Sequence, residues 1–349
     1  MDRRTNFLRM LRFETPESIP MSFCINYASY AHYGEAFLRE QMAAHPYLFP
    51  DYDDAAFKLS NPGFNSSKDV PWRDFWGSLW ETDTEGICGV ITDFPLEDWA
   101  ALEHYNMPDP DVCDGTYPWN ADACGEALRQ AKAAGRLAVT GLPHGHTFLR
   151  YTYLRGFENA IFDLFDEPPE FTRLLKMIET FNLAFLERCC VLQPDLITIP
   201  EDLGMQHGPM LSPDSFHRYF APIYQKMTTL VHQHGIPILM HSDGDIRALW
   251  DDLFSTGIEA FNIQDLVNTP EWIADNLKGK LAIELDIDRQ KITPFGTPAD
   301  IDKLVLDEVK LLGSRQGGLA MIYGLYPGIP KENVVALMDA MEKYAFHYA

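Results

Sequence analysis

"IPILMHSD", residues 236–243, decides the fold, because this aliphatic run ends in polar residues and directly follows a long helix signal. The preceding segment, residues 212–235, begins with Ser212 as a helix cap and ends with Gly235. Before that helix comes another strand-like run, "DLITIPED" at 195–202. Two buried strands separated by an amphipathic helix predict parallel strands covered by helices.

The same strand and helix unit repeats in both directions along the chain. Further strands are expected at 18–26, 136–143, 259–265, 280–286 and 318–324. Further helices are expected at 34–44, 168–192, 269–279, 297–313 and 330–345, with one more that ends at Gly257. No G-x-G-x-x-G fingerprint accompanies these units, so their number favours an α/β fold of the (β/α)8 TIM-barrel type over a doubly wound sheet.

The chain is expected to form a single domain over residues 1–349. Its first residues predict a short amphipathic helix and lack the apolar core of a signal peptide. Residues 50–118 are irregular and rich in Trp, Asp, Gly and Pro, which is typical of an insertion. We expect this insertion to be rich in β-hairpins and to lie over the mouth of the barrel.

Composition limits the function classes. The formal net charge of −23 argues against binding to nucleic acid or to an anionic membrane surface. No run of apolar residues is long enough to predict a membrane span. The six cysteines show no C-x-x-C pair and no regular framework, which favours a protein of the reducing cytoplasm.

Polar side chains recur where the predicted strands end. In a TIM barrel these carboxyl ends face the active site. The residues at these ends are His144, His146, Glu201, Asp202, His241, Asp243, Gln264, Asp265, Glu284, Asp286 and Tyr323. One such residue is usually a helix cap or a turn former. Acidic and imidazole groups on several consecutive strands instead predict a site for a divalent cation.

Glu201, His241 and Glu284 are the predicted metal ligands, because catalytic zinc takes three protein ligands and keeps one position open. The alternative for His241 is a packed histidine that hydrogen-bonds a neighbouring strand. Asp243 is predicted either to orient the imidazole as a carboxylate acceptor or to form a turn. The residues that could replace either glutamate are Asp202, His207 and Asp243. Carboxylate-rich sites discriminate poorly between zinc and other divalent ions.

Four stretches of the chain form a recognisable set: "LRGFENAIFDLFDEP", "LMHSDGDI", "PFGTPADIDKLVLDEVKLLG" and "GGLAMIYGLYPGIPKENVVALMDAMEKY". With these stretches the chain resembles the uroporphyrinogen decarboxylase superfamily over essentially its full length. It implies a (β/α)8 barrel. It also implies one of two activities, which are decarboxylation of uroporphyrinogen and zinc-dependent methyl transfer to or from a corrinoid protein.

Two departures from the superfamily's patterns choose between these activities. The decarboxylases carry an arginine-containing loop after the first strand, whereas the matching stretch here, "MSFCINYASYAHYG" (21–34), has no arginine. The coenzyme M methyltransferases use a His-x-Cys pair and a later Cys as zinc ligands. Here Asp243 stands two residues after His241, and "YGLYPG" (323–328) occupies the region of the later Cys.

A metal site without thiolates is a harder Lewis acid and suits an oxygen atom. We therefore expect an O-demethylase methyltransferase component, catalytic through Glu201, His241, Glu284 and Asp243. It would transfer the methyl group of a methoxylated aromatic to the Co(I) corrinoid of a separate protein. The alternatives are a methylamine or methylthiol donor, uroporphyrinogen decarboxylation, and a non-catalytic barrel that binds a small molecule. The expected substrate-binding residues are Tyr27, His144, His146, His207, Tyr323 and Tyr326. A homodimer is left open.

Overall fold

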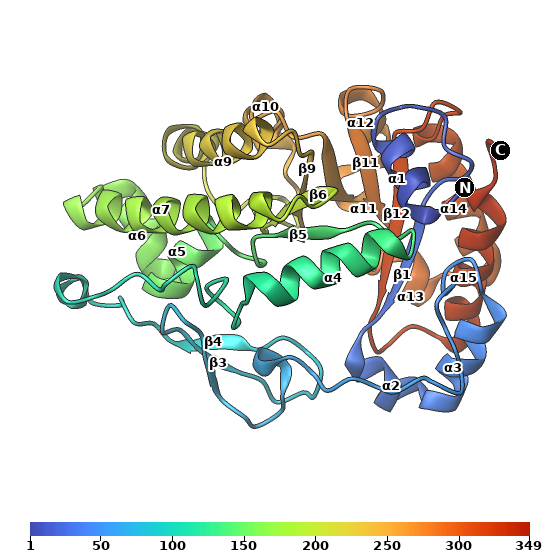
Figure 1. Ribbon diagram of the computed structural model, residues 1–349, viewed down its shortest axis with the longest axis horizontal. Coiled ribbons are helices and arrows are strands. Elements are labelled where there is room, and N and C mark those ends of the chain that lie inside the picture. The colour runs from blue at the N-terminus through green and yellow to red at the C-terminus, as the bar shows by residue number, and fades with distance from the viewer. The chain divides into compact units, whose positions relative to one another are not determined.

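The computed structural model describes residues 1–349, and the chain folds into two compact units (Figure 1). The first unit comprises Met1–Val70, Thr82–Gly89 and Ile263–Ala349. The second unit comprises Pro71–Glu81 and Val90–Asn262. In both units, parallel strands alternate with helices along the chain. The expectation of a single domain over the whole chain stays a prediction.

The first unit contains three parallel strands in the order β1 (Met21–Ile25), β12 (Leu319–Leu325) and β11 (Ala282–Asp286). Strands β11 and β12 are largely buried, as expected for parallel strands covered by helices, whereas β1 alternates between buried and more exposed residues. The helices of this unit are α1 (Arg3–Leu11), α2 (Tyr27–Tyr33), α3 (Glu35–Ala44), α11 (Asp265–Asn268), α12 (Pro270–Asn276), α13 (Ile292–Phe295), α14 (Pro298–Leu312) and α15 (Lys331–Ala345). Helix α14 begins with a capping box, in which Thr297 and Asp300 bond each other's backbone N–H.

The second unit contains three parallel strands in the order β9 (Ile238–Ser242), β6 (Leu196–Pro200) and β5 (Val139–Gly141). Its helices are α4 (Ala121–Ala133), α5 (Phe148–Arg155), α6 (Phe157–Asp166), α7 (Pro169–Val191), α8 (Pro213–Ser215), α9 (Ala221–Gln233) and α10 (Trp250–Ser255). Helices α7 and α9 lie side by side and contact each other (Figure 1). The strands and the long helices predicted from the hydrophobic pattern are therefore confirmed, whereas α4, α5 and α6 were not anticipated.

Strand β10 (Ala260–Gln264) spans the point where the second unit ends and the first resumes. Its side chains are buried up to Ile263, and they include one polar residue, Asn262, inside an otherwise apolar run. A buried amide needs a hydrogen-bond partner. Asn262 bonds the His241 side chain of the neighbouring strand β9.

Part of the predicted insertion forms a small antiparallel sheet of the second unit, β2 (Trp72–Arg73), β3 (Leu79–Glu81) and β4 (Val90–Asp93). The hairpin-rich character expected for residues 50–118 is confirmed in this sheet. A buried ion pair of 2.6 Å joins the insertion to helix α5, between Arg150 Nη1 and Asp74 Oδ2. Its placement over a barrel mouth stays a prediction.

All six cysteines are free thiols, in agreement with the absence of a disulfide pattern in the sequence. None of the helices combines the length and the apolar character that a membrane crossing requires.

Candidate metal centre

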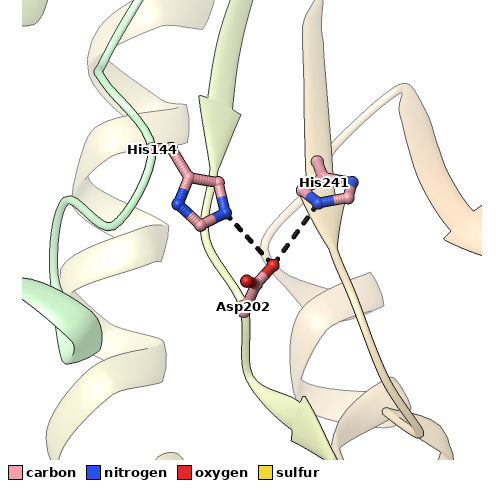
Figure 2. A group of neighbouring side chains, drawn as sticks. All are labelled: His144, Asp202 and His241. Carbon is pink, nitrogen blue, oxygen red and sulfur yellow. Dashed lines mark hydrogen bonds and ion pairs between the residues drawn. The ribbon is translucent and has the colours of Figure 1, made fainter. Parts of the chain in front are cut away.

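Three side chains of the second unit form a compact group of nitrogen and oxygen donors: His144, Asp202 and His241. One ligand atom from each lies within 4.8 Å of the others. Figure 2 shows both imidazole rings turned toward the Asp202 carboxylate. His144 Nε2 lies 3.1 Å and His241 Nε2 lies 3.4 Å from the same oxygen, Asp202 Oδ1. Two imidazoles and a carboxylate are an established ligand set for catalytic zinc.

The parallel sheet explains why these residues meet. His144 follows β5, Asp202 follows β6, and His241 is the fourth residue of β9. The register pairs Pro200 of β6 with His241 of β9, so Asp202 comes two residues beyond that pair. Because the carboxyl ends of parallel strands share one edge of a sheet, residues distant in sequence converge there.

The His241 ring is held from its other side by Asn262. Its Nδ1 forms a short hydrogen bond with Asn262 Oδ1. An amide oxygen only accepts, so Nδ1 carries the proton and Nε2 is the atom that faces Asp202. A hydrogen bond of this kind fixes the tautomer and the ring orientation of a metal-ligating histidine.

The electrostatics of the group favour a positive charge at its centre. Burial alone would raise the pKa of Asp202, but hydrogen bonds from His144 and His241 hold it far below its usual range. Burial opposes a charge on His241, yet the hydrogen bond to Asp202 and the charges of Asp243 and Asp202 raise its pKa to about 9. The group therefore stabilises a cation, and a divalent metal ion can take the place of the His241 proton.

A second carboxylate borders the group. Asp243 Oδ1 lies 3.5 Å from His241 Nε2. The Asp243 backbone N–H donates to Asp202 Oδ1 over 3.1 Å, so this residue also fixes the carboxylate between the two imidazoles. Asp243 thus faces the nitrogen on the side of the metal group, whereas Asn262 bonds the ring nitrogen that an orienting acceptor would take. The orienting role expected for Asp243 stays a prediction.

Glu201 lies outside this group. Its side chain is fully buried, and Oε1 accepts the backbone N–H groups of Thr147 and Leu149 over 2.7 and 2.9 Å, at the start of helix α5. Oε2 accepts a short hydrogen bond from the Tyr224 hydroxyl. One oxygen of the carboxylate thus holds the start of α5, where the helix has N–H groups without partners inside the helix, and the other bonds Tyr224 of α9. Asp202, the adjacent residue, occupies the position expected for Glu201.

Glu284, the third ligand predicted from the sequence, is a half-buried residue of β11 in the first unit and pairs with Ala320. The expected substrate-binding residues of that unit are Tyr27, Tyr323 and Tyr326. Tyr27 begins helix α2. Tyr323 is buried and donates to Thr293 Oγ1 over 3.2 Å, whereas Tyr326 is exposed. Their role in binding a substrate stays a prediction.

The three histidines expected to bind substrate differ in their surroundings. His144 belongs to the metal group. His146 is buried, its Nδ1 lies 2.6 Å from Thr147 Oγ1, and burial lowers its pKa. Its ring contacts Tyr224, the residue that bonds Glu201. His207 is exposed in the turn between the short strands β7 (Gly204–Met205) and β8 (Gly208–Pro209).

Comparison with known proteins gives a family match over most of the chain. The family model described as Uroporphyrinogen decarboxylase (URO-D) matches residues 82–344. A uroporphyrinogen decarboxylase of Prochlorococcus marinus is 29% identical over 131 residues, which are 37% of this chain and 36% of that protein. A Methylcobamide:CoM methyltransferase, MtaA of Methanosarcina barkeri, is 28% identical over 156 residues, which are 43% of this chain and 42% of that protein. The alignments therefore span less than half the length of these curated relatives.

Among solved structures, a methyltransferase from Methanosarcina mazei matches over 100% of both chains, with a TM-score of 0.67 and 15% sequence identity. At this identity the match shows the fold alone. The α/β TIM-barrel fold predicted from the alternation of strands and helices is confirmed by it.

Proposed function

The chain belongs to the uroporphyrinogen decarboxylase (URO-D) family, and from this premise we propose that it is a zinc-dependent methyltransferase that serves a corrinoid protein. The proposed donor is a methoxylated aromatic, and the proposed zinc ligands are His144, Asp202 and His241. The observation that carries the proposal is the donor set itself, two imidazoles and one carboxylate around a common centre without a thiolate.

Methyl transfer is favoured over decarboxylation because residues 21–34 contain no arginine. Uroporphyrinogen carries several carboxylates, and residues 21–34 contain no arginine to bind them. The formal net charge of −23 adds general repulsion of a polyanion. The curated relatives include both activities at similar identity, so the choice rests on the missing arginine and on the charge.

The choice of an oxygen donor rests on ligand hardness. When bound by this group, zinc supplies a Lewis acid for the ether oxygen. In the proposed reaction the bond between the methyl carbon and this oxygen breaks, and the oxygen keeps the electron pair as a phenolate. The methyl group forms a new bond to the Co(I) of a corrinoid, which we infer to be carried by a separate protein.

The protein's own residues have three roles in this proposal. Asp202 and His241 provide the carboxylate oxygen and the imidazole nitrogen that would bind the zinc ion. Asn262 accepts a hydrogen bond from His241 Nδ1 and so keeps the proton on that nitrogen. The lone pair of Nε2 is then available to bind the metal. His144, whose side chain is 46% exposed, is the most solvent-accessible of the three proposed ligands. An incoming substrate would therefore approach the centre from the side of His144.

The reaction is tested by mixing the zinc-loaded protein with reduced corrinoid protein and separate methyl donors. We expect the absorption of methyl-cobalt to appear with methoxyarenes and not with methylamines or methylthiols. The His241→Ala variant should give no signal. Transfer from methylthiols alone would contradict the argument from ligand hardness. Release of carbon dioxide from uroporphyrinogen would contradict the choice of methyl transfer.

A further inference from the structure

Two loops that carry the proposed zinc ligands are joined backbone to backbone. The first loop comprises residues 201–205, which follow β6 and include β7. The second loop comprises residues 241–245, which are the last two residues of β9 and the three that follow. Gly204 N–H donates to the Asp243 carbonyl over 3.2 Å, and Asp245 N–H donates to the Met205 carbonyl over 2.7 Å. The two loops therefore pair like a short ladder beside the metal group.

At the centre of this contact, two glycines leave no space for a side chain. A Cβ atom on Gly204 would lie 2.5 Å from the carbonyl carbon of Gly244, and a Cβ on Gly244 would lie 2.2 Å from that of Gly204. Both distances are far below any real carbon–carbon contact, and the atoms that would have to move belong to the backbone. Glycine is the residue that permits such a close approach of two chains.

The hydrogen bonds at the edges of this contact reach the ligands themselves. The Asp243 N–H donates to Asp202 Oδ1, the oxygen that lies between the two imidazoles. Leu203 N–H donates to the fully buried Ser242 Oγ over 2.9 Å. Asp202 is thus fixed by the loop that follows His241, and the spacing of the two loops determines the distance between these ligands.

We propose that Gly204 and Gly244 are positioning residues of the metal centre. Their contact holds Asp202 beside His241 before a metal binds, so the site is preformed. This inference rests on the proposed zinc site and adds how the site is kept in register. A preformed site binds with less loss of conformational freedom than one that must assemble, so separation of the loops weakens metal affinity.

The test uses alanine as a steric wedge. Gly204 does not have a positive φ, so Gly204→Ala adds a clash without backbone strain of its own. The control is Gly208→Ala in the hairpin that β7 and β8 form. At its φ of +144° alanine strains the hairpin backbone, but nothing lies within 4 Å of the added Cβ, so this variant disturbs the hairpin without a clash. Zinc affinity, measured by competition with a chromophoric chelator, should fall by about tenfold or more in Gly204→Ala and stay near wild type in Gly208→Ala.

A second measurement separates positioning from a general loss of structure. Gly204→Ala and Gly244→Ala break the same contact, and alanine at Gly244 also strains the backbone, because φ there is +79°. The loss of zinc affinity that comes from the shared contact is counted once, so the losses should be less than additive in the double variant. In the zinc-free wild type, the amides of Leu203, Asp243 and Asp245 should already be protected from hydrogen exchange. Gly204→Ala should expose them while leaving the core amides of β6 and β9 protected.

The outcomes separate the positioning role of Gly204 and Gly244 from the existence of the zinc site. If the wild type takes up no zinc, the proposed metal site is wrong. If the wild type binds zinc and Gly204→Ala binds it equally well, the site stands and the positioning role is wrong. Equal losses in Gly204→Ala and Gly208→Ala would also overturn the positioning role, because they would assign the effect to the hairpin as a whole.

Discussion

The Asp202 carboxylate has two imidazole partners on one oxygen, and its neighbour Glu201 has none. Of these two adjacent acidic residues, only Asp202 is a proposed metal ligand. Glu201 supports the start of helix α5 and bonds Tyr224. Substitution of the two residues should therefore have different consequences.

Asp202→Ala should lower zinc content well below one equivalent, because it removes the only anionic ligand of the group. Glu201→Gln should retain zinc and instead lower the free energy of unfolding by about 1–3 kcal/mol, since it alters a buried hydrogen-bonded carboxylate. Zinc is measured by elemental analysis after dialysis, and stability by denaturant unfolding. The reverse pattern, with zinc lost only in Glu201→Gln, would return Glu201 to the ligand set.

Asn262 should act on the metal through His241. Replacement by leucine removes the acceptor of the Nδ1 proton, and we expect zinc affinity to fall by about 10–100-fold. Asn262→Asp keeps an acceptor at the same place and should retain most of the affinity. The measurement is chelator competition on both variants. Equal zinc affinity in the leucine variant and the wild type would show that Asn262 does not orient the ring.

The sequence could predict the type of the site residues better than their identity. His241 was found because it ends an apolar strand. Glu201 and Asp202 follow the same strand, and successive side chains point to opposite sides, so a register error of one residue exchanges their roles. The sequence also carries a signal for Asn262, which is a polar residue between Phe261 and Ile263 in a predicted strand, but its partner depends on strand pairing.

At the scale of elements, the buried ion pair between Arg150 of α5 and Asp74 holds the insertion to the second unit. Asp74 also accepts hydrogen bonds from the Ser78 N–H and the Trp80 indole. Removal of the arginine alone would leave a buried carboxylate without its counter-charge. The loss is larger than the net contribution of the intact pair.

Arg150→Met should therefore lower the free energy of unfolding by about 3–5 kcal/mol. The double variant Arg150→Met with Asp74→Asn should recover part of that loss, because the uncompensated charge is gone. Urea unfolding of the single and double variants measures both effects. Strictly additive losses would mean that the two groups are not coupled across this contact.

The elements themselves were largely predictable, for a physical reason. The strands are β-rich apolar runs between helices with recognisable caps, such as Pro169 at the start of α7 and the capping box of α14. Helices α4 to α6 were not anticipated. Helix α5 carries polar and aromatic residues that are buried by tertiary contacts, including Arg150 and Arg155, so its sequence shows no clear apolar face.

At the scale of the whole molecule, one buried pair of acids should make stability depend on pH. Glu308 of α14 and Asp265 at the start of α11 are both 2% exposed. Burial and the charges of Asp265, Asp288 and Asp307 raise the pKa of Glu308 well above its usual range. Burial likewise raises the pKa of Asp265. The folded protein therefore keeps a proton that the unfolded chain has released.

This proton stabilises the fold fully below the unfolded-state pKa of about 4.3, and the stabilisation is lost as pH rises toward the folded-state value. Glu308→Gln mimics the protonated acid. Relative to wild type it should gain up to about 1.4 kcal/mol of stability per pH unit above that point, until the folded-state pKa is passed. Denaturant unfolding across pH measures the difference. A constant difference at all pH values would exclude a retained proton on Glu308.

X-ray absorption spectroscopy at the zinc edge of the zinc-loaded protein, in thiol-free buffer, reports which atoms bind the metal. We expect a first coordination shell of nitrogen and oxygen at about 2.0–2.2 Å with the scattering pattern of two imidazoles. That pattern should decrease to one imidazole in His144→Ala. A sulfur neighbour at about 2.3 Å, or an unchanged imidazole count in that variant, would contradict the proposed ligand set.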